Sequence, residues 1–274
     1  MNRHGQFLPK KSLGQNFLIN PNVGERIITS CDLTPTDIIL EIGPGKGALT
    51  HSLSSCAKKV IAIEKDDHLA AQLKRTFANT NVEVIHGDIL KYPFDGLPNN
   101  TKIVGNLPYN IATPIIEKVL NNRRKFNAFY MTVQLEYGQR IAAQPNSKSY
   151  GSFSCFVQYY ADTKILFKIK NSSFQPIPKV QSCFLQLDLL KEPKHKAQDE
   201  EGLFRIIRAC FGQRRKTVQN TLSTIFRKER TGELLQALDI DPKLRAENIS
   251  LEKYVQISNM AVKEEANGRK IFIQ

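Results

Sequence analysis

The residues of this chain best suited to chemistry are Asn106, Leu107, Pro108 and Tyr109, which follow one another directly. The carboxamide of Asn106 carries an acceptor oxygen, which can take a hydrogen bond from an exocyclic amine. Pro108 fixes one backbone torsion, and Tyr109 offers a flat ring on which a base can stack. The segment therefore predicts a catalytic site that holds the amine of a nucleobase, if a reactive cofactor lies nearby.

A glycine-rich turn that could bind such a cofactor precedes this segment. Gly43, Gly45 and Gly47 follow a short apolar run and precede an expected helix, the place where doubly wound sheets bind nucleotides. A Walker phosphate loop is excluded, because Leu40 stands where its first glycine would be. The Gly-x-Gly-x-Gly spacing only nearly matches a dinucleotide site. The turn alone leaves a dinucleotide and S-adenosylmethionine open as cofactors.

Two carboxylates extend this expected cofactor site. Glu64 ends the second expected strand, where a carboxylate can accept both ribose hydroxyls of an adenosine. Asp88 follows the third strand and is placed to accept from an adenine amine. Both acids suit either cofactor equally. The fourth strand favours S-adenosylmethionine, without a metal, because it ends in Asn106 and its neighbours, for which a dehydrogenase has no use.

Strands that alternate with helices must position these residues. Asn20 and Pro21 have the residue types that open a helix. Later segments at 163–169 and 182–189 are expected to pair as a hairpin at a sheet edge. The pattern predicts an α/β fold with a doubly wound, Rossmann-like parallel sheet. Its expected strands are 38–40, 60–63, 82–85, 103–104 and 128–133, and its expected helices follow the glycine turn to about 56 and span 66–77 and 113–120.

The composition changes at 191–202, where charged residues and a proline predict a linker. We therefore expect a first domain at 1–192, with a basic leader at 1–20, and a small all-helical domain at 198–274. The second domain is rich in cations. Its cluster of Arg214, Arg215 and Lys216 could bind RNA phosphates, and a solvated helix face is the alternative.

The charge and the cysteine pattern narrow the class of protein. A formal charge of +13 and a pI of about 9.5 favour a polyanionic partner. The five cysteines are widely spaced and the histidines show no zinc spacing, so neither a disulfide framework nor a metal site is expected. No apolar run is long enough to cross a bilayer, and the N-terminal residues do not resemble a signal peptide. We expect a cytoplasmic protein, with a monomer as the default.

Several longer motifs make the chain similar to a known family. It resembles the ribosomal RNA adenine dimethyltransferases, in particular the bacterial members that act on small-subunit (16S) RNA. The resemblance covers nearly the whole chain. The segments that carry it are Leu13-Gly14-Gln15-Asn16-Phe17-Leu18, Glu41-Ile42-Gly43-Pro44-Gly45, Asn106-Leu107-Pro108-Tyr109-Asn110-Ile111, Ser147-Lys148-Ser149-Tyr150-Gly151, Phe174-Gln175-Pro176-Ile177-Pro178-Lys179-Val180 and Phe211-Gly212-Gln213-Arg214-Arg215-Lys216-Thr217.

The resemblance implies a class I methyltransferase that dimethylates two adjacent adenosines in an immature small ribosomal subunit. It implies that the target adenine lies between Tyr109 and Phe174. Leu135 and Gly212 depart from the family pattern, which puts RNA contacts there in doubt. A large-subunit RNA methyltransferase of the resistance type and a non-catalytic RNA-binding assembly or transcription factor stay open as alternatives. The cofactor residues implied by the resemblance are Asn16, Leu18, Gly43, Glu64, Asp88 and Asn106.

Overall fold

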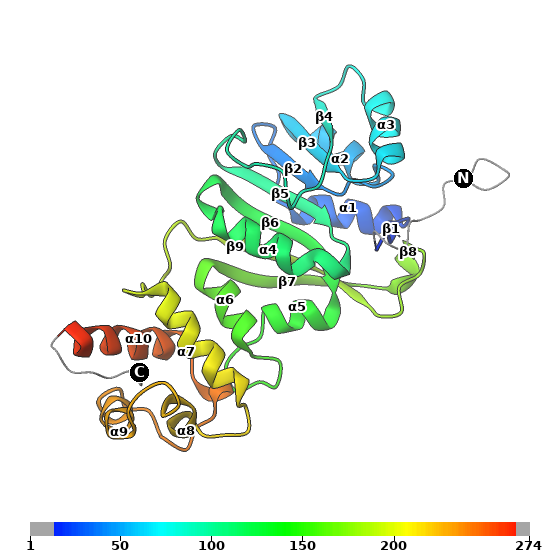
Figure 1. Cartoon of the computed structure of the whole chain (residues 1–274). Coiled ribbons are helices and arrows are strands. Elements are labelled where there is room, and N and C mark those ends of the chain that lie inside the picture. Colours follow the sequence, from blue (N-terminus) through cyan, green and yellow to red (C-terminus); the bar gives the residue numbers. More distant parts are fainter. Residues whose placement is uncertain (1–13, 267–274) are drawn as a thin grey trace. The chain divides into compact units, whose positions relative to one another are not determined.

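The computed structural model describes residues 14–266 of the 274-residue chain (Figure 1). Residues 1–13 of the expected basic leader lie outside the described residues. The described chain divides into two compact units. The first contains residues 14–138 and 162–191, and the second contains 139–161 and 192–266. The sequence-based boundary had assigned 139–161 to the first domain.

A seven-stranded sheet in the order β4-β3-β2-β5-β6-β9-β7 forms the centre of the first unit. Strands β2, β3, β4, β5 and β6 pair in parallel, and β9 runs antiparallel to β6. This confirms the predicted α/β fold with a mostly parallel sheet. The strands are β2 (Ile38–Ile42), β3 (Lys59–Glu64), β4 (Val82–His86), β5 (Thr101–Asn106), β6 (Phe126–Gln134), β7 (Ala161–Ile169) and β9 (Ser182–Leu189).

Local capping explains where two helices of this unit begin. The side chain of Asn20 accepts a hydrogen bond from the backbone N–H of Val23, and Pro21 occupies the first helical position. Asp66 accepts in the same way from the N–H groups of His68 and Leu69. The helices that connect the strands are α1 (Pro21–Ser30), α2 (Thr50–Cys56), α3 (Asp67–Thr76), α4 (Ala112–Asn121) and the short η2 (Tyr109–Ile111) and η3 (Arg123–Lys125).

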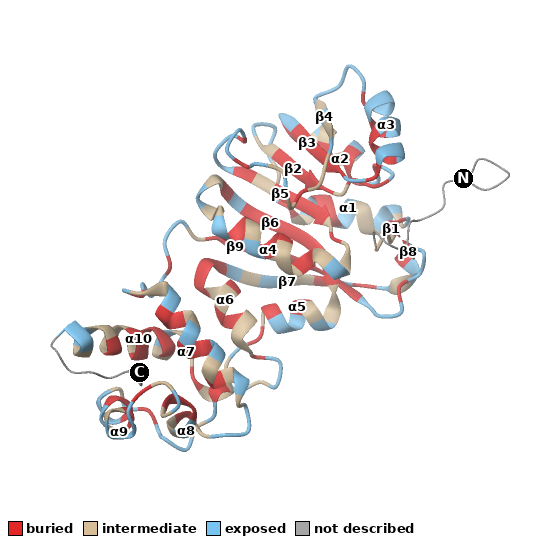
Figure 2. Cartoon of the chain, viewed as in Figure 1, coloured by how far each residue is buried: buried red, intermediate tan, exposed pale blue. Residues whose placement is uncertain are grey.

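The sheet is buried on both faces, as a parallel sheet must be. Ile39 and Val60 pack into one core cluster with Ile27 of α1 and Leu53 of α2. The next residue of β2, Leu40, points to the other face and is also inaccessible. Figure 2 shows buried residues along β2, β3, β5 and β6. The continuous apolar runs of the sequence therefore mark central strands.

The last strands confirm the expected pairing at the edge, because β9 lies between β6 and the outermost strand β7. The chain between β7 and β9 contains η4 (Asn171–Ser173) and β8 (Phe174–Gln175). Strand β8 pairs antiparallel with β1 (Phe17–Leu18), with Leu18 opposite Phe174. This pairing joins the segment before α1 to the segment before β9.

In the described part of the second unit, the regular elements are helices, apart from the first residue of β7. The linker predicted at 191–202 ends earlier than expected, because α7 begins at Glu200 and not after Gly202. Asp199 caps this helix by accepting from the N–H of Gly202, and two glutamates suit its positive N-terminus. The helices are α6 (Ser152–Tyr160), α7 (Glu200–Gly212), α8 (Val218–Leu222), α9 (Lys228–Ala237), η5 (Ala246–Asn248) and α10 (Leu251–Ala266), while α5 (Leu135–Ile141) crosses between the units.

Aromatic packing ties α6 to this helical unit. The rings of Phe156 and Tyr159 lie 5.3 and 5.4 Å from the ring of Phe204 on α7. The hydroxyl of Tyr160 donates to the carboxylate of Glu200 at 2.6 Å. Residues 139–161 therefore pack in one core with α7, which follows about forty positions later in the chain.

Candidate active site

The carboxyl ends of β2, β3, β4 and β5 meet at one rim of the sheet in the first unit, because these strands are parallel and in register. A cavity opens there. The predicted site residues that line it are Asn16, Leu18, Gly43, Glu64, Asp88, Asn106, Leu107, Pro108 and Tyr109. The structure thus brings together the predicted cofactor residues and the predicted amine-binding segment.

The glycine turn gives the cavity an open wall. Gly43 has a φ of +68°, and a Cβ atom built on it would meet no atom within 4 Å. Gly45 has a φ of +60°, and a Cβ there would lie 3.0 Å from the ring of Phe17. Both positions require a left-handed backbone, and the space beside Gly43 is available to a ligand.

Glu64 braces this turn from the end of β3. One carboxylate oxygen accepts from the N–H of Gly45 at 2.9 Å, and the other accepts from the N–H of Asp66 at 2.8 Å. The side chain is buried, which raises the pKa of the carboxyl above its ordinary value, against the two backbone hydrogen bonds. Each oxygen keeps a second lone pair, so the carboxylate can still accept ribose hydroxyls.

Asp88 is more exposed than Glu64 and is held by a cation. The ammonium of Lys65 donates to one of its oxygens at 2.8 Å, and the N–H of Leu90 donates to the other at 3.0 Å. The hydrogen bond from Lys65 is the main reason why the pKa of Asp88 lies below its ordinary value. Asp88 is therefore an ionised acceptor at neutral pH.

Asn106, the last residue of β5, is oriented by a hydrogen bond from its own side chain. Its Nδ2 donates to the backbone carbonyl of Asn16 at 2.7 Å. The side chain of Asn16 in turn donates to the carbonyl of Gly14 at 3.3 Å. With its amide nitrogen engaged in this way, the side chain of Asn106 retains its Oδ1 as an acceptor. This is the atom that the predicted chemistry needs.

The residues after Asn106 form a tight turn into η2. The N–H of Leu107 donates to the carbonyl of Thr132 on β6 at 3.3 Å, and the carbonyl of Pro108 accepts from Ile111 at 3.1 Å. The hydroxyl of Tyr109 forms a 2.8 Å hydrogen bond with Ser182 on β9. Burial raises the pKa of Tyr109 above its ordinary value, so the phenol stays neutral. The ring of Tyr109 is thus anchored at its far end.

Phe174 does not line this cavity. It is 1% exposed and belongs to the core cluster that includes Leu18, Tyr130, Phe167 and Phe184. Its place in β8 opposite Leu18 sets it beside a residue of the cavity wall. Stacking of the target base on Phe174 stays a prediction.

The predicted RNA-binding cluster lies in the second unit and its members differ in their contacts. The guanidinium of Arg214 pairs with Glu247 at 2.6 Å and also donates to two backbone carbonyls. Arg215 and Lys216 are exposed. RNA binding by the three residues stays a prediction, but Arg214 has a structural partner that its neighbours lack in the described chain.

Two residues of the site escaped the sequence reasoning. Glu41, next to the glycine turn, lines the cavity while being 2% exposed, and burial raises the pKa of its carboxyl to about 8. One of its oxygens has no hydrogen-bond partner among the described residues. The signal in the sequence was an acid within an apolar strand, two residues before Gly43. Ser182, the partner of Tyr109, had no local signal, because the two residues are 73 positions apart.

These residues fit the cofactor that the sequence predicts. The open face of Gly43 and the acceptor carboxylates of Glu64 and Asp88 suit an adenosine. Among residues 14–266, no cluster of histidine, cysteine or acidic residues could hold a metal ion. None of the described helices is both long enough and apolar enough to span a membrane.

Comparison with known proteins places this site in a family. The family model described as ribosomal RNA adenine dimethylase matches residues 6–263. A curated relative from Moorella thermoacetica, named ribosomal RNA small subunit methyltransferase A, is 39% identical and the match covers 93% of each chain. A relative of the same name from Alkaliphilus metalliredigens is 40% identical, with 92% of each chain covered.

Solved structures agree at the level of the fold. A dimethyladenosine transferase from Plasmodium falciparum superimposes with a TM-score of 0.80 at 25% identity, covering 94% of this chain and all of that one. The 23S rRNA methyltransferase ErmE reaches a TM-score of 0.74 at 24% identity, with 88% and 98% covered. The match along nearly the whole sequence and the intact rim of the sheet lead to one conclusion: this chain belongs to the ribosomal RNA adenine dimethylase family.

Proposed function

We propose that this chain dimethylates the exocyclic amines of two adjacent adenosines near the 3′ end of small-subunit (16S) ribosomal RNA, with S-adenosylmethionine as methyl donor. The orientation of Asn106 by the carbonyl of Asn16 is the observation that carries the proposal. It leaves the side-chain oxygen available as an acceptor beside the glycine turn. The names of the relatives support the small subunit as the source of the RNA.

The cofactor would be held by the rim of the sheet. Glu64 and Asp88 would accept from the ribose hydroxyls and the adenine amine, and Gly43 would allow close approach of the ligand. Asn16 and Leu18 would cover it from the segment before α1. When bound, S-adenosylmethionine supplies an electrophilic methyl group on a sulfonium.

Orientation of the amine is the main task of the protein's own residues. The lone pair of an adenine amine is delocalised into the ring, so the nitrogen is a poor nucleophile. The Oδ1 of Asn106 and the carbonyl of Leu107 would each accept one N–H and favour a pyramidal nitrogen. Fixed dipoles of this kind act through positioning and electrostatic preorganisation. No general base is required, because the proton leaves from a far more acidic ammonium nitrogen.

The target base must leave its stack to reach this pocket. Tyr109 would receive one face of the extruded ring, and Phe174 is proposed for the other. Each stacking contact contributes roughly 1–3 kcal/mol. The hydrogen bond between Tyr109 and Ser182 fixes the ring before the base arrives, which reduces the entropy lost on binding.

We further propose that the two units divide the work. The first would bind the cofactor and the base, and the second, which adds residues 139–161 to the helical domain expected at 198–274, would bind RNA through its cations. The RNA would be part of an immature small subunit in the cytoplasm, and the protein would act as a monomer.

Labelled methyl transfer tests the substrate and the site together. The wild type and Asn106→Ala are incubated with S-adenosylmethionine and either immature small subunits or large-subunit RNA, and Asn100→Ala, an exposed turn residue, is the control. We expect label in the small subunits with the wild type and the control, and almost none with Asn106→Ala. Label in large-subunit RNA alone would show that the proposed substrate, small-subunit RNA, is wrong. Calorimetry with S-adenosylhomocysteine tests the cofactor separately. Absence of binding would exclude both a small-subunit and a large-subunit RNA methyltransferase.

A further inference from the structure

The turn that follows β4, residues 88–92, begins with one of the two acids proposed to hold the cofactor. The N–H groups of Lys91 and Tyr92 both donate to the backbone carbonyl of Asp88 at 2.9 Å. The N–H of Leu90 donates to Oδ1 of the same residue at 3.0 Å. Asp88 and the next residue line the cavity. The shape of this turn therefore decides where the carboxylate of Asp88 lies.

A lysine of α4 binds the opposite end of the turn. The ammonium of Lys118 donates to the carbonyl of Leu90 at 2.9 Å and to the carbonyl of Tyr92 at 2.6 Å. A cation is favoured at the carbonyl end of a helical turn. Burial lowers the pKa of Lys118 and the charge of Asp88 opposes that shift, so the ammonium and the carboxylate lie within electrostatic reach of each other. The turn is thus closed by Asp88 at its start and by Lys118 at its end.

The ammonium of Lys118 is itself held in place by an aromatic ring. Its Nζ lies 4.7 Å from the centroid of the Phe94 ring, which is a cation–π contact. Phe94 is buried and packs edge to face against Phe126, the first residue of β6, with 5.1 Å between the ring centroids. Lys118 therefore ties the turn to the core of the first unit.

The direct cationic partner of Asp88 is a weaker constraint on its position. Lys65 donates to Oδ2 of Asp88 at 2.8 Å, but the side chain of Lys65 is 53% exposed. An ion pair in so much solvent contributes little to a fixed geometry, because water screens it and both side chains lose freedom in forming it. The backbone of the turn, and with it Lys118, therefore sets the direction of the Asp88 carboxylate.

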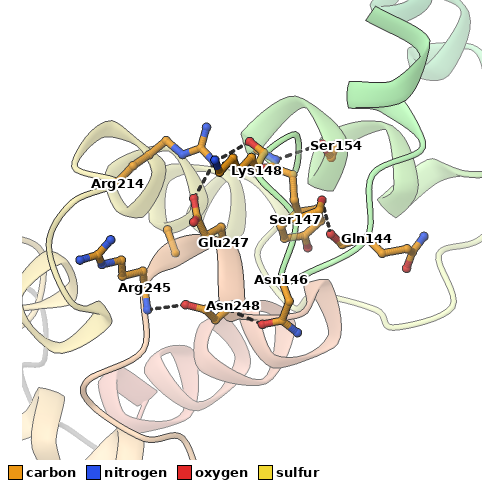
Figure 3. A network of polar contacts seen from close by, with 12 residues as sticks. Gln144, Asn146, Ser147, Lys148, Ser154, Arg214, Arg245, Glu247 and Asn248 are labelled. Atoms are coloured by element: carbon orange, nitrogen blue, oxygen red, sulfur yellow. Dashed lines mark hydrogen bonds and ion pairs between the residues drawn. The ribbon is translucent and has the colours of Figure 1, made fainter. Parts of the chain in front are cut away.

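A cation that binds backbone carbonyls beside a carboxylate also holds a loop of the second unit. There the guanidinium of Arg214 donates to the carbonyl of Lys148 at 2.9 Å and pairs with Glu247 at 2.6 Å (Figure 3). The arrangement around Lys118 has the same parts. It differs in one respect, because the carboxylate beside Lys118 is Asp88, which lines the cavity.

We propose that Lys118 is a positioning residue of the cofactor site, which holds the turn so that the carboxylate of Asp88 is directed at the adenine amine before the cofactor binds. The proposal rests on the proposed function, in which Asp88 accepts from that amine. Lys118 stands outside the described lining of the cavity, so it acts through Asp88 and not by contact with the ligand. Groups held in their bound geometry in advance cost less entropy when a ligand binds.

Loss of the ammonium changes the turn directly. Without it, the carbonyls of Leu90 and Tyr92 lose a strong donor and must turn toward water. The turn then no longer fixes the carboxylate of Asp88. Lys118→Met removes the donors and the charge, while its apolar side chain still covers the ring of Phe94.

Two ligands separate this positioning role from a general loosening of the site. S-adenosylhomocysteine offers an exocyclic amine to Asp88, whereas S-inosylhomocysteine carries a carbonyl oxygen at the same place and cannot donate from it. Loss of a purely structural contact would lower the affinity for both ligands alike. Loss of a contact that acts through Asp88 lowers the preference for the adenosyl ligand over the inosyl ligand.

Calorimetry with the full chain measures both affinities. We expect Lys118→Met to weaken binding of S-adenosylhomocysteine about tenfold, equivalent to roughly 1.4 kcal/mol, and to lower the preference at least about fivefold. In an Asp88→Ala background, the same substitution should change the affinity less than about twofold, as coupled residues do in a double-mutant cycle. In methyl transfer, KM for S-adenosylmethionine should rise more than kcat falls.

Lys125→Met is the matched control. Lys125 donates to the carbonyls of Asp95 and Leu97 at 2.6 and 3.5 Å, just beyond the same turn and outside the described lining of the cavity. Its affinities should stay within about twofold of those of the wild type. Melting curves check that each variant is folded. If Lys118→Met does not fold, Lys118→Gln, which keeps a donor amide without the charge, is measured in its place and should lower the preference about threefold.

An unchanged preference in the folded Lys118 variant, or an equal loss of affinity for both ligands, overturns the inference. A full effect of Lys118→Met in the Asp88→Ala background overturns it as well. In each of these cases, binding of S-adenosylhomocysteine by the wild type leaves the proposed function intact. If the wild type binds neither ligand, the proposed function fails and the inference fails with it.

Discussion

The Nδ2 of Asn106 donates a 2.7 Å hydrogen bond to the backbone carbonyl of Asn16, ninety residues earlier in the chain. The contact joins the end of β5 to the segment before α1, and both residues line the cavity. It assigns the orientation of the carboxamide, since only its nitrogen can donate. The side chain of Asn106 therefore both links two segments of the cavity wall and presents the acceptor oxygen.

Asn106→Asp should weaken cofactor binding as well as methyl transfer. The new carboxylate cannot donate to the carbonyl of Asn16 and places two oxygens against each other. We expect the affinity for S-adenosylhomocysteine to fall about tenfold, which corresponds to roughly 1.4 kcal/mol. Calorimetry measures this, with Asn100→Asp in an exposed turn as the control. Unchanged affinity in Asn106→Asp would show that the bond to Asn16 does not support the cofactor site.

Glu41→Gln should change how stability depends on pH. The carboxyl has an ordinary pKa of 4.5 in the unfolded chain and a pKa of about 8 when buried. Between these values the folded protein binds a proton that the unfolded chain lacks, so the wild type loses stability as the pH rises. Glutamine does not titrate. As the pH rises from about 5 to about 8, the unfolding free energy of the variant should increase relative to that of the wild type by at least about 1 kcal/mol.

Urea denaturation at the two pH values measures this difference. Glu83→Gln, at an exposed residue paired with Lys59, is the control and should show little change. A constant difference between Glu41→Gln and the wild type at both pH values would mean that Glu41 is ionised in the folded protein.

The strands and the rim of the sheet could be predicted because their signals are local. Apolar runs such as 60–63 end in an acid or a glycine turn, and parallel pairing brings those ends together without further information. The partnership of α6 with α7 could not be predicted in this way. The ring of Phe156 contacts Phe204, and an amphipathic pattern does not indicate which distant surface it will meet.

The same limit applies within the site. Asn106, Glu64 and Asp88 each stand at a strand end, so their places followed from the alternation of strands and helices. The bond of Tyr109 to Ser182 depends on the insertion of β9 beside β6, which is a property of the folded sheet. Likewise, Arg214 looked like its cationic neighbours until its contact with Glu247 was visible.

Tyr109→Phe and Tyr109→Ala should separate the ring from its hydroxyl. Phenylalanine keeps the stacking face and loses only the hydrogen bond to Ser182, so we expect stability to fall by about 1 kcal/mol and methyl transfer to stay within about threefold. Alanine removes the ring, and kcat/KM should fall roughly 5- to 150-fold, the equivalent of about 1–3 kcal/mol. Steady-state kinetics with small subunits measure methyl transfer by both variants. A similar large loss in Tyr109→Phe and in Ser182→Ala would assign the main role to the hydroxyl.

Phe174→Leu tests whether a ring that is 1% exposed also meets the target base. Leucine fills most of the volume beside Leu18 and Phe184 but has no aromatic face. The unfolding free energy should fall by about 1 kcal/mol, as for a moderate change in core shape. If the proposed stacking occurs, kcat/KM for small subunits falls by about fivefold or more, at a temperature where the variant is fully folded. Phe167→Leu, in the same core cluster and outside the cavity lining, is the matched control and should lose stability alone. Equal kinetic behaviour of the two variants would make Phe174 a core residue and leave the stacking to Tyr109.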